Sequence, residues 1–185
     1  MVVRATYQTI PRHPHSGSPP RPIDIHLFVD ASESWGIGLW WNGKWLAWEL
    51  KPGWNEDGQR IGCLRMTAVL LAVLTLITAG NFANTPVIIH SDNIGVIRAL
   101  KPDNWKSRGQ HQNEILRHIV RHIIEDKIWI SLKYVNTKLN PADGPSRGKF
   151  LPKTQLYAKP LRVPSYLKPL IHNAVQYHDH RVPTE

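Results

Sequence analysis

The segment Ile61–Gly80 constrains the fold more than any other, because it is apolar on almost every side of a helix. Its sequence, IGCLRMTAVLLAVLTLITAG, contains a single charged residue, Arg65. A helix that is hydrophobic all round must be buried by other elements, and Gly80 predicts where this one ends. Arginine is almost never fully buried unless a negative group meets it. The group that faces Arg65 is therefore the central question about this chain.

We expect an intracellular protein, cytoplasmic or nuclear, with no membrane partner. The longest apolar run, Met66–Ala79, has about 14 residues, which is too short to span a bilayer. The first residues contain no apolar segment of the kind found in secretory signals. The lone Cys63 excludes an internal disulfide framework and fits a reducing compartment.

Prolines divide the chain into three parts. Residues 1–22 are predicted to form a Pro-rich N-terminal extension, and residues 150–185 a Pro-rich C-terminal extension. Both have the composition of extended linkers, although a short helix fits after Pro169. Residues 23–149 lie between them and are predicted to form one domain.

Strands and helices follow one another in this domain in an order that favours an α/β fold. Ile23–Ala31 is predicted to be a strand, and Asn42–Gly43 is a strong hairpin signal between the strands GIGLWW and KWLAWEL. After the apolar helix come a buried strand in TPVIIHSDN, helices in NIGVIRAL and HQNEILRHIVRHIIED, and a last strand in KIWISLKYV. This order predicts a mixed five-stranded sheet, three antiparallel strands followed by parallel ones, with helices on its faces.

Three aspartates are expected where strands end. Asp30 lies near the end of the first strand, Asp92 directly precedes a helix, and Asp143 follows the last strand. Sites in open sheets form at the carboxyl ends of strands, so these side chains are expected to converge. Grouped carboxylates repel one another unless cations share the site, and oxygen ligands suit Mg²⁺. The three together indicate a metal site, although each alone also fits a helix cap or a turn.

The charge of the chain favours a polyanionic partner. Its formal net charge is +9, and a chain this basic most often binds nucleic acid. Arg108, Arg117 and Arg121 are candidates for contacts to nucleic acid, with Asn93 and Asn113 as polar candidates. Such contacts need basic and polar side chains rather than a metal ion.

Three motifs taken together carry a resemblance to a known family. FVDASESW, VIIHSDN and NPADGPSRG are similar to the ribonuclease H domain of retroelement (fungal retrotransposon-type) reverse transcriptase polyproteins, over about Asp24–Gly148. The resemblance implies a ribonuclease-H-like fold, in which four carboxylates bind two Mg²⁺ ions and cut the RNA strand of an RNA–DNA hybrid. It makes Asp30, Asp92 and Asp143 the catalytic, metal-binding acids, and a neighbouring reverse transcriptase an implied partner.

The fourth acid of that family is missing. The family has a Glu on the first helix, in a segment that reads roughly I-G-x-x-E-x-x-A, where this sequence reads IGCLRMTA. Arg65 therefore replaces the Glu, and a ligand of charge −1 becomes a permanent +1. We expect Arg65 to pair with Asp92, Asp30 or both, and the site to hold one Mg²⁺ ion or none.

Three functions follow from these observations. In the first, the domain is an inactive or weak ribonuclease H that still binds RNA–DNA hybrid or duplex nucleic acid. In the second, it is an active Mg²⁺-dependent endonuclease that cuts the RNA strand of hybrids with three Asp and a substitute ligand. In the third, it is a non-catalytic scaffold for protein interactions, with the Pro-rich flanks and the Trp-rich hairpin as contact surfaces.

Overall fold

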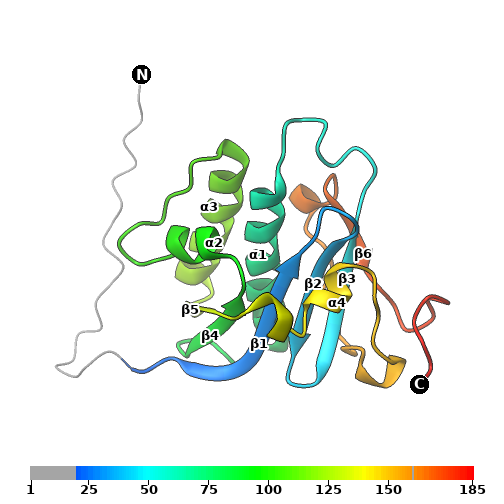
Figure 1. Cartoon of the computed structure of the whole chain (residues 1–185). Helices are drawn as coiled ribbons and strands as arrows, with labels where there is room; N and C mark the ends of the chain where they lie inside the picture. Colours follow the sequence, from blue (N-terminus) through cyan, green and yellow to red (C-terminus); the bar gives the residue numbers. More distant parts are fainter. Residues whose placement is uncertain (1–19, 160) are drawn as a thin grey trace.

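The computed structural model describes residues 20–159 and 161–185, so the predicted extension over residues 1–22 lies almost wholly outside it. The described chain is an α/β fold built on one mixed sheet (Figure 1). Its strands are β1 (Ile23–Ala31), β2 (Gly36–Trp41), β3 (Lys44–Leu50), β4 (Pro86–Ser91), β5 (Trp129–Tyr134) and β6 (Ile171–Ala174). Its helices are α1 (Ile61–Ala79), α2 (Ile94–Ala99), α3 (Gln110–Glu125) and α4 (Asp143–Ser146), with short 3-10 turns η1 (Thr137–Leu139), η2 (Lys153–Gln155) and η3 (Ser165–Leu167).

The strands lie in the order β5–β4–β1–β2–β3–β6. Strands β1, β2 and β3 are antiparallel neighbours, and β4 and β5 run parallel to β1, as the sequence predicts. The turn between β2 and β3 confirms the hairpin signal: Asn42 and Gly43 have φ angles of 47° and 81°. Two successive positive φ angles form the two-residue turn whose twist matches that of the flanking strands.

Helix α1 is buried on most of its sides, as its composition predicts. It packs against β1, β2 and α3, and Gly80 ends it in the left-handed conformation, with φ 82°. The helix has the length and mean hydropathy, 2.1, of a membrane span, yet 67% of that apolar window is buried inside the domain. Most of this helix therefore contacts other elements of the domain.

The C-terminal segment corrects two predictions. Residues Ile171–Ala174 form β6, which pairs antiparallel with β3. The sheet therefore has six strands instead of the five predicted. The same strand replaces the helix that was expected after Pro169. The segment also packs onto the domain instead of running as an extended linker. Its buried apolar residues are Leu161, Val163, Leu167, Leu170, Ile171, Ala174, Val175 and Val182. The folded unit therefore continues well past residue 149.

Helix α4 lies against the sheet at β1, β2 and β3 (Figure 1). This approach depends on Gly38, because a Cβ atom there would overlap the carbonyl oxygen of Ala142 and the amide nitrogen of Ser146. Gly38 is the ladder partner of Asp30 on β1. The missing side chain of a glycine thus brings α4 into contact with the strand that carries the first aspartate.

Candidate functional site

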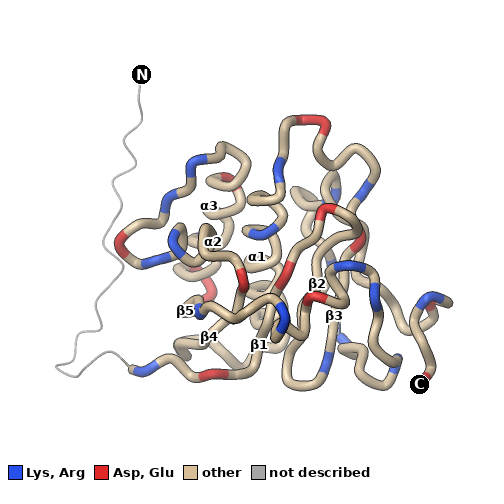
Figure 2. The backbone as a smooth tube through the Cα atoms, viewed as in Figure 1, with Lys and Arg blue, Asp and Glu red and all other residues tan. Residues whose placement is uncertain are grey.

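The structure brings Asp30 and Asp92 together at one edge of the sheet. Asp30 is the penultimate residue of β1 and Asp92 directly follows β4, and these two strands are parallel neighbours. Both side chains line one narrow hollow together with Arg65. Figure 2 shows acidic segments close together where β1 and β4 end. Asp143 begins α4, which contacts β1 beside them.

Asp30 is a buried carboxyl group with little compensating positive charge. Its side chain is 7% exposed, and the hydroxyl oxygen of Ser146 lies 2.8 Å from its Oδ2 atom. The pKa of Asp30 is raised to about 6, mainly because the carboxyl group is buried. The negative charge of Asp92 also raises this pKa, and the charge of Asp143 adds a smaller increase. The hydrogen bond from Ser146 lowers it. The raised pKa therefore reflects burial of the carboxyl group first and repulsion from the neighbouring acids second.

Replacing Asp30 with Asn is expected to stabilise the protein at pH 7.5 but not at pH 4. In the pH range between the ordinary value of 3.8 and about 6, the folded protein still binds a proton that the unfolded chain has released, so stability falls as the pH rises. Above that range, ionised Asp30 lowers the free energy of unfolding by up to about 3 kcal/mol. Asn carries no charge and removes this cost. Urea unfolding at the two pH values measures the difference.

The exposed carboxylate of Asp103 provides the control for this experiment. Asp103→Asn is expected to leave the free energy of unfolding almost unchanged at both pH values, since an exposed charge remains hydrated in either state. Equal stabilisation by Asp30→Asn at pH 4 and pH 7.5 would show that ionisation of Asp30 does not carry the cost.

Asp92 is held by a segment that crosses the ends of β1 and β4. The Thr137 hydroxyl donates to Asp92 Oδ2 at 2.7 Å, and the Val135 N–H donates to the Ser91 carbonyl at 3.1 Å. Further along, Asn140 Nδ2 donates to the carbonyl oxygen of Val29 at 3.0 Å. The sequence did not identify Thr137 or Ser146 as site residues, because a hydroxyl near an aspartate in sequence carries no signal of a contact across the fold.

The ion pair at this site is made by Arg147 instead of Arg65. Arg147 Nε lies 2.9 Å from Asp143 Oδ1, one helical turn away. The hydrogen bond to Asp143 is the main reason that the pKa of Arg147 is raised, and the charges of Asp30 and Asp92 act in the same direction. The i, i+4 spacing within NPADGPSRG was the available sequence signal for this pair.

The prediction that Arg65 pairs with Asp92 or Asp30 is wrong. Among the described residues no ion pair joins Arg65 to a carboxylate, although it lines the same hollow as both acids. Its Nε atom is buried without a hydrogen-bond partner. Arg65 thus lines the hollow without pairing with its acids, and its buried Nε donor remains unused, which is costly in a folded protein.

The residues predicted to contact nucleic acid divide into two groups. Arg108, Arg117 and Arg121 are exposed, the last two on α3. Asn93 and Asn113 instead make bonds within the protein. Asn93 Oδ1 caps α2 by accepting from the Val96 N–H at 2.8 Å, and the Asn113 side chain makes two bonds, of 2.9 and 2.8 Å, to the backbone of Ser107. Both asparagines therefore have a local structural role.

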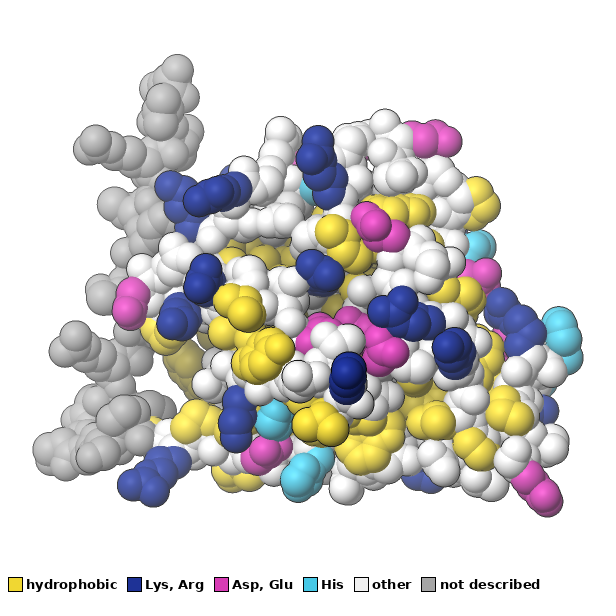
Figure 3. All heavy atoms as spheres, viewed as in Figure 1, with side chains coloured by type: hydrophobic (Ala, Val, Ile, Leu, Met, Phe, Trp, Pro, Cys, Tyr) yellow, Lys and Arg dark blue, Asp and Glu magenta, His cyan; other side chains and the backbone are white. Residues whose placement is uncertain are grey.

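Acidic and basic side chains occupy different parts of the face of the molecule that carries the site. In Figure 3 acidic side chains gather near the middle of this face, and Lys and Arg side chains surround them. In residues 20–159 and 161–185, no three His, Cys, Asp or Glu side chains are grouped closely enough to hold a metal ion. The arrangement is thus an acidic hollow with a basic surround, in which only two of the three acids share the hollow.

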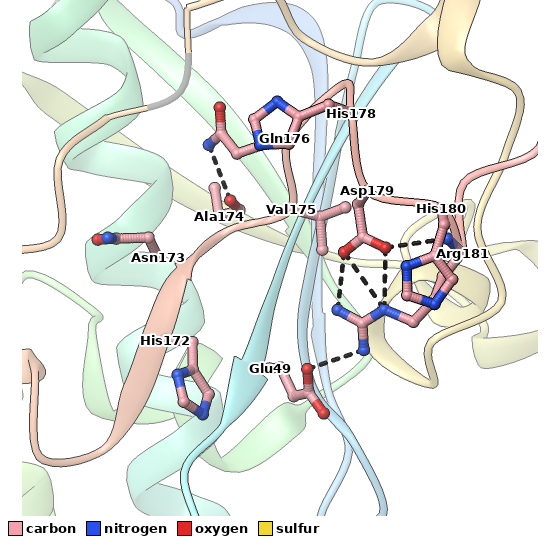
Figure 4. Close-up of a pocket in the computed structure, with 10 residues that line it drawn as sticks. All are labelled: Glu49, His172, Asn173, Ala174, Val175, Gln176, His178, Asp179, His180 and Arg181. Atoms are coloured by element: carbon pink, nitrogen blue, oxygen red, sulfur yellow. Dashed lines mark hydrogen bonds and ion pairs between the residues drawn. The ribbon is translucent and has the colours of Figure 1, made fainter.

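A second hollow, of about 440 Å³, lies beside β6 and is shown in Figure 4. Its charged groups satisfy one another: Arg181 bridges Glu49 at 2.9 Å and Asp179 at 2.8 Å. The hydrogen bond from Arg181 is the main cause that lowers the pKa of Asp179 to about 2. His172 and His178 also line this hollow but point away from each other in Figure 4. With its charges already paired, this hollow is a weaker candidate than the acidic one.

Comparison of the chain with family models, with curated proteins and with solved structures gives no match. The acidic hollow is therefore assigned as the candidate site from its own residues. The burial of Asp30, its proximity to Asp92 and the unpaired donor of Arg65 distinguish it from the rest of the described surface.

Proposed function

We propose that this chain is a ribonuclease-H-like domain of retroelement origin that binds RNA–DNA hybrid or duplex nucleic acid and has an inactive or weak catalytic centre. The observation that carries the proposal is the pair Asp30 and Asp92, at the ends of two adjacent parallel strands, with Arg65 lining the same hollow. The mixed sheet, which begins with three antiparallel strands, is compatible with such a fold, to which β6 adds a sixth strand.

The residues of the hollow fit one divalent cation better than two. Asp30 and Asp92 are the carboxylates that would hold it, since their mutual repulsion is one cause of the raised pKa of Asp30. Such an ion supplies Lewis-acid chemistry at a phosphate group. A second ion does not fit, because Arg65 brings a positive charge to the hollow and Arg147 already occupies an oxygen of Asp143.

Nucleic-acid binding does not require the second ion. Contacts to the phosphate backbone are made by basic side chains, and they fix the position of a duplex without reading its sequence. Arg108, Arg117 and Arg121 are exposed and form no ion pair within the described chain. RNA–DNA hybrid differs from duplex DNA in groove shape and in its 2′-hydroxyl groups, so we propose recognition by shape.

Alanine at Arg108, Arg117 and Arg121 is expected to weaken hybrid binding and to reduce its dependence on salt. Each lost phosphate contact lowers the slope of log K against log salt by about 0.7–0.9, so the triple variant is expected to lose about two units of slope. Fluorescence anisotropy over a salt series measures both quantities. Lys44→Ala is the control, because Lys44 starts β3 at the hairpin turn, two strands away from Asp30 and level with Leu27 of β1. A loss of about 0.7–0.9 in the control, equal to the loss per residue in the triple variant, would contradict these contacts.

A cleavage assay distinguishes the proposed function from its two rivals. The protein is incubated with a labelled RNA–DNA hybrid in Mg²⁺ and, separately, in Mn²⁺, beside its Asp30→Asn variant. The proposal expects a gel shift with little or no cleavage. Strong cleavage that Asp30→Asn abolishes would establish an active endonuclease, and the absence of any shift at low salt would favour the protein-interaction scaffold.

A further inference from the structure

Exposed hydrophobic side chains adjoin the acidic hollow. Of the large hydrophobic side chains that are exposed in the described chain, Ile94 and Tyr134 are each 51% exposed and Leu139 is 74% exposed. All three belong to segments that border Asp92. Figure 3 shows hydrophobic side chains beside the central acidic patch. Solvent-exposed groups of this size so close to one site indicate a contact surface.

Backbone pairing explains why these segments meet. Tyr134 is the ladder partner of Ser91, the residue before Asp92, and α2, which begins at Ile94, contacts β5. Leu139 ends the turn η1, which begins at Thr137, the residue that hydrogen-bonds Asp92. No aromatic ring of the described chain stacks on Tyr134, and about half of this residue is exposed to solvent.

Basic side chains border this hydrophobic surface. Arg98 lies four residues after Ile94 on α2, which places both on one face of the helix. Lys138 directly precedes Leu139. Both basic residues are exposed, and neither forms an ion pair within the described residues. An exposed tyrosine ring can stack on a flat aromatic group, and the unpaired positive charges beside it can bind phosphates attached to that group.

We infer that Tyr134, with Ile94 beside it, binds an unpaired nucleotide of a single-stranded extension next to the hybrid, with its phosphates at Arg98 and Lys138. This inference rests on the proposed function and adds to it a preference for partly single-stranded substrates. Bases inside a duplex cover each other's faces, whereas an unpaired base in an extension offers its face to an aromatic side chain. A protein partner fits less well, because stable protein interfaces bury roughly 800 Å² on each side, far more than three side chains supply.

The test compares a short blunt hybrid with the same hybrid carrying a single-stranded extension, at the 5′ or the 3′ end. Binding is measured by anisotropy with EDTA present, so that cleavage does not interfere. We expect one of the extended hybrids to bind about five-fold or more tightly than the blunt one, which is the effect of stacking a single base. Tyr134→Ala is expected to reduce that affinity to the blunt value without changing blunt binding, whereas Tyr134→Phe keeps the preference because it keeps the ring.

Tyr177→Ala is the matched control. Tyr177 is 66% exposed and follows β6, at the edge of the sheet opposite to β5, so its removal is expected to leave the preference intact. Equal affinity of the parent for blunt and extended hybrids would overturn the inference while leaving the proposed function standing. The inference would also be overturned if Tyr134→Ala weakened the binding of blunt and extended hybrids equally. If the parent binds none of the hybrids, the proposed function fails and this inference fails with it.

Discussion

Replacing Arg65 with Glu is expected to tighten Mg²⁺ binding at least about ten-fold. The variant exchanges a positive charge for a carboxylate in the hollow that Asp30 and Asp92 line. A +1 and a +2 charge about 5 Å apart repel by roughly 6–7 kcal/mol at an effective dielectric constant of about 20. Relief of about a fifth of that repulsion is enough for a ten-fold change in affinity.

The same variant is expected to be less stable than the parent when no metal is present. A third carboxylate beside Asp30 and Asp92 adds to a repulsion that already raises the pKa of Asp30. Because Mg²⁺ binds only the folded state, it is expected to raise the melting temperature of Arg65→Glu more than that of the parent. Calorimetric titration and thermal unfolding with and without Mg²⁺ measure both effects without requiring any cleavage.

Arg60→Glu is the control for the change of charge alone. Arg60 is exposed and immediately precedes α1, so its replacement alters the net charge equally but does not reach the hollow. If the two variants gained Mg²⁺ affinity equally, the gain would be a long-range effect of net charge. If Arg65→Glu bound Mg²⁺ no more tightly than the parent, the alignment of Arg65 with the missing Glu would be wrong.

Ending the chain at Lys159 is expected to abolish cooperative folding. The deletion removes β6, which pairs with β3, and every buried side chain between Leu161 and Val182. Burial of one large apolar side chain contributes roughly 1.5–3 kcal/mol, so the loss of eight buried residues is comparable to the total stability of a typical domain, about 5–15 kcal/mol. Urea unfolding followed by circular dichroism is the measurement.

Removing only Thr184 and Glu185 is the control, because both residues are exposed. This shorter deletion is expected to leave the unfolding midpoint and slope unchanged. A cooperative transition of nearly full amplitude in the chain that ends at Lys159 would mean that the domain folds without the segment that follows Lys159.

The local elements of the fold were predictable because each has a short-range cause. Ile23–Ala31 is a strand at the predicted bounds, and Asn42–Gly43 forms the predicted turn because these residue types tolerate positive φ angles. The helix from Ile61 ends where Gly80 allows a left-handed cap. β6 was missed because a four-residue strand between prolines has too few residues to show a period, and its stability comes from pairing with β3.

For the candidate site, the sequence by itself determined which acids lie at strand ends and that a positive charge occurs on the helix nearest to them. Only the tertiary structure decided how these charges pair. Arg65 and Arg147 carry the same group, yet Arg147 reaches Asp143 from one helical turn away, while α1, buried on most sides, holds Arg65 beside Asp30 and Asp92 without an ion pair. Charge and strand position are properties of residues along the chain, whereas pairing depends on distances of a few ångströms that the packing of distant elements sets.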